Sequence, residues 1–66
     1  MERKITPKQL EILKLIADGY SSDEIAKELE NSKNTINNIR LTMLNRFQVK
    51  NTSHLIAWGF RNGYLE

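Results

Sequence analysis

The sequence lacks the residues from which most disulfide and metal sites are built. Its 66 residues include no cysteine and a single histidine, which excludes a disulfide framework and a thiolate zinc site. That histidine, His54, has no acidic cluster around it in the sequence, so we expect no metal or cofactor. There is also no apolar run long enough for a signal peptide or a membrane span. We therefore expect a soluble, cytoplasmic protein without a membrane attachment.

Acidic residues are absent from almost the whole second half of the chain. Between Asn31 and Leu65 there is no Asp or Glu, whereas the basic residues there are Lys33, Arg40, Arg46, Lys50 and Arg61. The formal net charge is only +2, but a half of one sign suggests a polyanionic partner. Chance segregation in a short chain explains the same pattern, and charge alone does not separate the two explanations.

The sequence carries no strong period-two alternation, so no strand is predicted, and its helix signals are frequent instead. Thr6-Pro7 followed by Gln9 predicts an N-cap, a proline in the first turn and a capping box. Gly19 then ends this first helix. A second capping box, Ser21 with Glu24, predicts a short helix immediately afterwards.

Two further helices complete the predicted fold. Asn31 is expected in a left-handed turn, and Ser32 caps a third helix over residues 33–47. Asn51 or Thr52 caps a fourth helix that ends near residues 62–63. We predict one all-α domain over residues 1–66, a compact four-helix domain in which the second and third helices form a helix-turn-helix. Generic helical hairpins share that outline.

The predicted third helix has two chemically different faces. At about 100° per residue, Ile36, Ile39, Met43 and Phe47 lie on one side. The opposite side holds Asn34, Asn37, Asn38, Leu41 and Asn45. A single polar residue on the outer face of a helix is ordinarily only solvated. Asparagine is a poor helix former, however, so four asparagines along one face require a further explanation.

DNA supplies that reason. An asparagine amide can donate and accept at once, which matches the major-groove edge of adenine, and an exposed leucine can touch a thymine methyl. We therefore predict base contacts from Asn34, Asn37, Asn38 and Leu41. Phosphate contacts are predicted from Lys33, Thr35 and Arg46, and from the helix start near Ser22.

The sequence also resembles the LuxR-type (GerE/NarL-type) helix-turn-helix domains of bacterial transcription regulators. The resemblance runs without a gap from Ile5 to about Tyr64, and it rests on "ITPKQLEILKLIADGYSSDEIA", "SKNTINN", "ML" and "FRNG". It implies that the third helix enters the major groove, that Ser22, Thr35 and Arg46 lie at backbone-contact positions, and that the fourth helix forms a homodimer contact. Trp58 and Arg61 are the residues we expect at that contact.

Six positions depart from the family pattern, including Gln9 in place of a usual glutamate and Ile39 in place of a common histidine. Asn31 replaces a usual apolar residue, and Gln48 replaces a common glycine. His54 replaces a usual glutamate, which should remove a capping partner from the fourth helix. Asn37 replaces a frequent lysine, so we expect a weaker electrostatic contribution and a preference for A·T-rich sites.

The function predicted from these observations is sequence-specific binding of double-stranded DNA as a dimer on paired half-sites, without enzymatic activity. A second hypothesis is a protein-interaction module of the same fold that binds RNA polymerase or another regulator, and a third is a purely structural bundle. Catalysis has no supporting constellation, since His54 has no evident nucleophile or acid beside it, and a surface or cap role is expected for it. Trp58 is expected to be partly buried.

Overall fold

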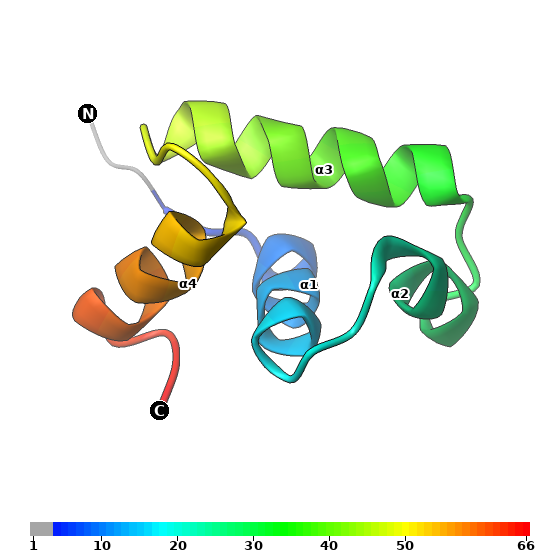
Figure 1. Cartoon of the computed structure of the whole chain (residues 1–66), viewed down its shortest axis with the longest axis horizontal. Helices are drawn as coiled ribbons and strands as arrows, with labels where there is room; N and C mark the ends of the chain where they lie inside the picture. Colours follow the sequence, from blue (N-terminus) through cyan, green and yellow to red (C-terminus); the bar gives the residue numbers. More distant parts are fainter. Residues whose placement is uncertain (1–3) are drawn as a thin grey trace.

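The computed structural model describes residues 4–66, which form four helices joined by short turns (Figure 1). In chain order they are α1 (Pro7–Ala17), α2 (Ser22–Glu28), α3 (Lys33–Arg46) and α4 (Thr52–Arg61). No strand occurs within residues 4–66. The all-α prediction is confirmed, and the helix bounds agree with the expected ones to within about a turn.

Each helix is preceded by an N-cap residue whose side chain accepts a hydrogen bond from its first turn. Thr6 Oγ1 accepts from the Gln9 N–H at 3.1 Å, and Gln9 Oε1 accepts in return from the Thr6 N–H. In the same way, Ser21 Oγ accepts from the Glu24 N–H, and Glu24 Oε1 accepts from the Ser21 N–H. Further along the chain, the caps of α3 and α4 are Ser32 and Asn51. The predicted caps are therefore confirmed, and Asn51 rather than Thr52 is the N-cap of α4.

The described helices end alike, in a left-handed residue directly after the C-cap. This residue is Gly19 after α1 and Gly63 after α4, where glycine adopts positive φ without steric penalty. After α3 the left-handed residue is Gln48, at φ 56°. The Val49 N–H then reaches the Leu44 carbonyl at 3.0 Å, which pairs an otherwise free carbonyl of the last turn.

The turn between α2 and α3 corrects one prediction. The left-handed residue is Glu30, at φ 54°, and not Asn31. The C-cap is Leu29, so the position after it must turn left-handed for the Asn31 N–H to reach the Ala26 carbonyl, at 2.8 Å. The hydrogen-bond pattern of the helix end fixes the position here, and it overrides the intrinsic tolerance of asparagine for this conformation.

The core lies where α3 crosses the other three helices, which lie together on one side of it (Figure 1). Its fully buried large side chains are Ile12, Leu13, Ile25, Ile36, Met43 and Leu55. At the far end, Trp58 stacks on Phe47 with ring centroids 4.1 Å apart and on Tyr64 at 5.4 Å. The core thus holds one face of α3 and leaves the opposite face uncovered.

Residues 4–66 contain neither a membrane-spanning helix nor a cluster of metal-binding side chains. No helix there combines the length and the apolar character that a membrane crossing requires. In the same range, no three or more His, Asp or Glu residues gather in a way that could hold a metal ion.

Candidate nucleic-acid interface

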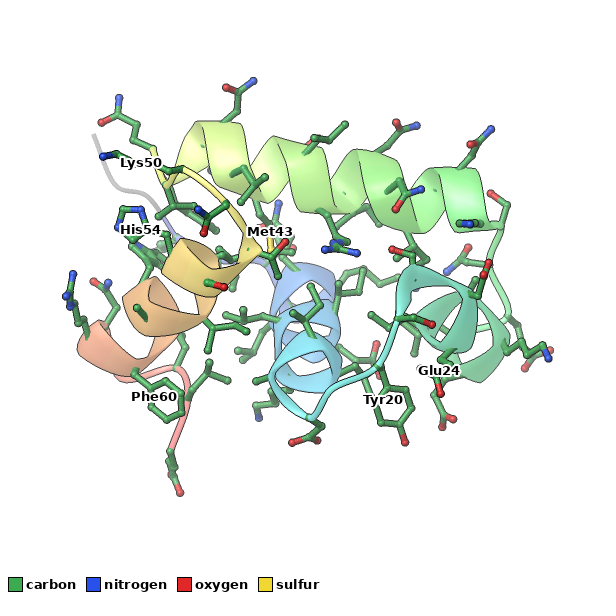
Figure 2. The ribbon with its side chains drawn as sticks, in the orientation of Figure 1. Tyr20, Glu24, Met43, Lys50, His54 and Phe60 are labelled. Atoms are coloured by element: carbon green, nitrogen blue, oxygen red, sulfur yellow. The ribbon has the colours of Figure 1, made fainter. Side chains whose placement is uncertain are left out.

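The outer face of α3 is an exposed surface formed mostly by amides. Asn34 and Asn38 are exposed, and Leu41 keeps 61% of its surface accessible although it is a large apolar residue. Ile36 and Met43, which point to the other side of the helix, are fully buried. Figure 2 shows Met43 directed into the molecule, while other α3 side chains extend away from the remaining helices. The predicted separation of the two faces is therefore present.

Asn37 differs from the other amides of this face because it bonds to the neighbouring helix. Its Oδ1 accepts a hydrogen bond of 2.8 Å from the Ser22 hydroxyl at the start of α2. Asn37 is accordingly only half-exposed. The helical periodicity placed it correctly on the outer side of α3, but periodicity within one helix contains no information about a partner fifteen positions earlier.

Arg40 joins three helices, a role that the sequence did not reveal. Its guanidinium donates to Ser22 Oγ on α2 at 2.6 Å and to Thr52 Oγ1 on α4 at 2.8 Å. Both acceptors are neutral hydroxyls, so the positive charge has no carboxylate partner here. The available signal was an arginine on the flank of an amphipathic helix within an acid-free segment.

The predicted phosphate-contact residues differ in how accessible they are. Lys33 and Arg46 are exposed at the two ends of α3. Lys33 pairs with Asp23 at 3.6 Å, and both side chains are more than half exposed, so this pair contributes little to stability. A phosphate can therefore replace the Asp23 carboxylate at small energetic cost.

Two hydroxyl residues predicted at phosphate contacts already have partners inside the chain. Thr35 is exposed, and its Oγ1 lies 2.8 Å from the Ser32 hydroxyl. Ser22 is only 8% exposed, and its hydroxyl bonds to both Asn37 and Arg40. The Ser22 hydroxyl is therefore already occupied by two partners on α3.

α4 has the Asn51 cap without the reciprocal side-chain bond of a capping box, as expected from His54 in place of glutamate. His54 Nδ1 accepts from the Lys50 N–H at 3.1 Å, and the His54 N–H donates to Asn51 Oδ1 at 2.8 Å. Figure 2 shows Lys50 and His54 close together at the start of α4. The imidazole therefore bonds to the residue before the N-cap and not to the N-cap N–H, which lies within the predicted surface or cap role of His54.

The outer side of α4 presents one basic and one aromatic residue. Arg61 is exposed in the last turn, and Phe60 is 51% exposed, at the end of α4 far from α3 in Figure 2. Trp58, expected to be partly buried, is indeed half-buried in the stack with Phe47 and Tyr64. Most of its ring surface is therefore used inside the chain.

Comparison with known proteins agrees with this geometry. Residues 3–58 match the family described as bacterial regulatory proteins, luxR family. The chain belongs to this family. A luxR-family helix-turn-helix domain acts in transcription regulation by binding DNA, and this is the function class of the chain.

Two curated relatives are similar over almost the whole chain. An uncharacterized response regulatory protein of Escherichia coli (strain K12), YgeK, is 36% identical over 62 residues, which is 94% of this chain and 42% of that protein. The transcriptional regulatory protein DesR of Bacillus subtilis (strain 168) is 32% identical over 62 residues, 94% of this chain and 31% of DesR. The chain thus spans less than half the length of the relatives that it matches.

Proposed function

We propose that this luxR-family domain binds double-stranded DNA with α3 in the major groove. The observation that carries the proposal is the exposure of Asn34, Asn38 and Leu41 along one line of α3, opposite a fully buried face. Neither Asn34 nor Asn38 has a side-chain hydrogen bond within residues 4–66, so both amides are available for base edges. An α-helix fits the major groove, where each base pair presents a distinct pattern of donors and acceptors.

Phosphate contacts position the helix in this proposal. Lys33 and Arg46 lie at opposite ends of α3, so they reach the backbone on either side of the contacted bases. Thr35 and the backbone N–H groups in the first turn of α2 are proposed as further phosphate contacts. No Asp or Glu occurs between Asn31 and Leu65, so α3 approaches the negatively charged duplex without a carboxylate of its own.

The proposed bound form is a homodimer on paired half-sites, joined through α4. Trp58 and Arg61 were the expected contact residues, and the exposure of Phe60 adds an apolar group to the same helix. In a twofold dimer the same patch serves both subunits. RNA polymerase is proposed as a further partner of the assembled regulator.

Two matched substitutions test the α3 surface by fluorescence anisotropy on a duplex obtained by unbiased selection. Asn38→Ala removes a base contact, so the discrimination between the selected duplex and single-base variants should fall roughly tenfold at one base pair. Lys33→Ala removes a phosphate contact, so affinity for all sequences should fall alike and the salt dependence should weaken by about one counterion.

Leu44→Ala is unsuitable as a control because Leu44 packs against the core. Lys8→Ala, at an exposed position of α1, is a suitable control and should leave the affinity for DNA and its salt dependence unchanged. If both α3 variants bind like the unmodified chain, the interface lies elsewhere. If the chain binds no duplex at low salt and a protein partner protects α3, the interaction-module hypothesis replaces this one.

A further inference from the structure

The hydrogen bonds from Arg40 to Asn37 form a chain with a defined direction. Arginine has five N–H donors and no acceptor, so Ser22 Oγ must accept the 2.6 Å bond from Arg40. The single hydroxyl hydrogen of Ser22 is then free to donate, and it does so to Asn37 Oδ1 at 2.8 Å. Thr52 holds the other side of the guanidinium. Arg40 occupies one acceptor site of Ser22 Oγ, and the Ser22 hydrogen is directed to the Asn37 amide oxygen, so the oxygen of Asn37 is turned toward α2.

This direction leaves the amide nitrogen of Asn37 as the group that faces outward. Within residues 4–66, no buried side-chain polar atom lacks a hydrogen-bond partner. Asn37 Nδ2 has no partner there, so it must reach the surface. Asn37 also lines a groove of about 390 Å³, together with Arg40, Leu41, Leu44 and Thr52. The groove gives a base edge access to the amide beside Leu41.

We propose that the Arg40–Ser22–Asn37 chain makes Asn37 a hydrogen-bond donor to DNA and selects a base with an acceptor-only edge. Adenine is recognised by asparagine through both amide atoms, with the oxygen accepting from N6 and the nitrogen donating to N7. Here the oxygen is turned to Ser22, so adenine can offer only N7 to the amide nitrogen, and its N6 donor is left without the asparagine acceptor. Guanine presents O6 and N7, and thymine presents O4, without a donor. Asn37 is thus predicted to prefer these keto bases to adenine and cytosine.

The inference rests on the proposed function, because it assigns a specificity to one residue of the proposed interface. It also revises the expected A·T preference at this position. Asn34 and Asn38 have no side-chain hydrogen bond within the part of the chain that the structure describes, so they keep both amide atoms for adenine, whereas Asn37 does not. Arg40 and Ser22 contact no base in this account, and they act as positioning residues through the Asn37 amide.

The test compares base preference at one position among matched variants. Selection from random duplexes with the unmodified chain and with Asn37→Ala identifies the base pair that Asn37 contacts, because its preference disappears in the variant. Dissociation constants are then measured on four duplexes that differ only there. The unmodified chain should bind G or T on the contacted strand roughly tenfold more tightly than A or C.

Breaking the chain should remove this preference without abolishing binding. Ser22→Ala and Arg40→Met free the amide to rotate, so the adenine duplex should come within about twofold of the guanine duplex. Arg46→Met is the control, because it removes an α3 charge and leaves the chain intact. It should weaken all four duplexes alike and preserve the tenfold ratio. Circular dichroism verifies the fold of each variant, and Ser22→Ala decides the matter if Arg40→Met does not fold.

Three results would overturn the inference. They are an adenine preference in the unmodified chain, an unchanged ratio in Ser22→Ala, or no position affected by Asn37→Ala. All three leave DNA binding itself intact, so they are distinguishable from failure of the proposed function, in which the unmodified chain selects no duplex at all.

Discussion

Gly59 is a position at which α4 packs closely against the side chains of Leu13 and Leu65. It is buried in α4, and a Cβ built on it would lie 2.8 Å from Leu65 Cδ1 and 3.0 Å from Leu13 Cδ2. Leu13 is fully buried, so it has no space into which to move. Leu65 follows α4 and is also buried. Gly59→Ala therefore forces a methyl group into an occupied volume.

Two effects of opposite sign determine how much Gly59→Ala changes the free energy of unfolding. Alanine is the better helix former by about 1 kcal/mol, whereas an extra methyl in a packed core typically costs about 1–3 kcal/mol. Contacts at or below 3.0 Å from two different side chains place this site in the upper half of that range. We expect a net loss of about 1–2 kcal/mol in the free energy of unfolding. For a domain of this size that is a decrease in Tm of roughly 5–15 °C.

Chemical denaturation and thermal unfolding measure this loss, and a second background isolates its cause. In Leu65→Ala, two of the three close contacts disappear, so Gly59→Ala should there be close to neutral or stabilising. The double-mutant cycle should give a coupling of about 1 kcal/mol. If Gly59→Ala stabilises the otherwise unmodified chain by the full helix-propensity gain, the packing of α4 on α1 described above is wrong.

Three other predictions concern the helix ends and the Arg40 bridge. Gln48→Gly should raise the free energy of unfolding by roughly 0.5–1 kcal/mol in urea titrations, because Gln48 has φ 56°, a conformation that favours glycine; a loss of stability would contradict this. The backbone N–H and then the hydroxyl of Ser21 lower the pKa of Glu24, so the stability from this cap is present above the unfolded pKa of about 4.3 and is lost as pH falls through the folded value. In Glu24→Gln, the free energy of unfolding should depend less steeply on pH over that acid range than in the unmodified chain. Equal slopes for the two proteins would refute a stabilising role for the Glu24 carboxylate. Arg40→Met should cost about 2 kcal/mol of unfolding free energy, since it removes two hydrogen bonds from a charged group that is only half-exposed, whereas Arg46→Met should cost less than about 0.5 kcal/mol.

The helix starts were predictable because capping is local. Thr6 and Gln9, or Ser21 and Glu24, are three residues apart, and each pair satisfies free backbone groups of one turn. The buried and outer faces of α3 were predictable for a similar reason, since both follow from the period of a single helix. These signals are complete within a few turns of sequence.

The features that sequence reasoning missed depend on contacts between helices or on the geometry of helix ends. The Ser22 partner of Asn37 and the bridging role of Arg40 arise only when α2 and α4 pack against α3. The left-handed turn residue is Glu30 because hydrogen bonds at the helix end define that position. The bond from the Lys50 N–H to the His54 imidazole is likewise not anticipated by the usual Glu pattern.

The central claim is that the outer face of α3 contacts DNA bases, and side-chain amide NMR tests it most directly. Titrating the ¹⁵N-labelled chain with a selected duplex should shift the Nδ2 resonances of Asn34, Asn37 and Asn38, while the side-chain amide of Gln9, buried in the cap of α1, should shift little. Saturable shifts confined to Asn62 and the α4 backbone, with the three α3 amides unchanged, would contradict the claim.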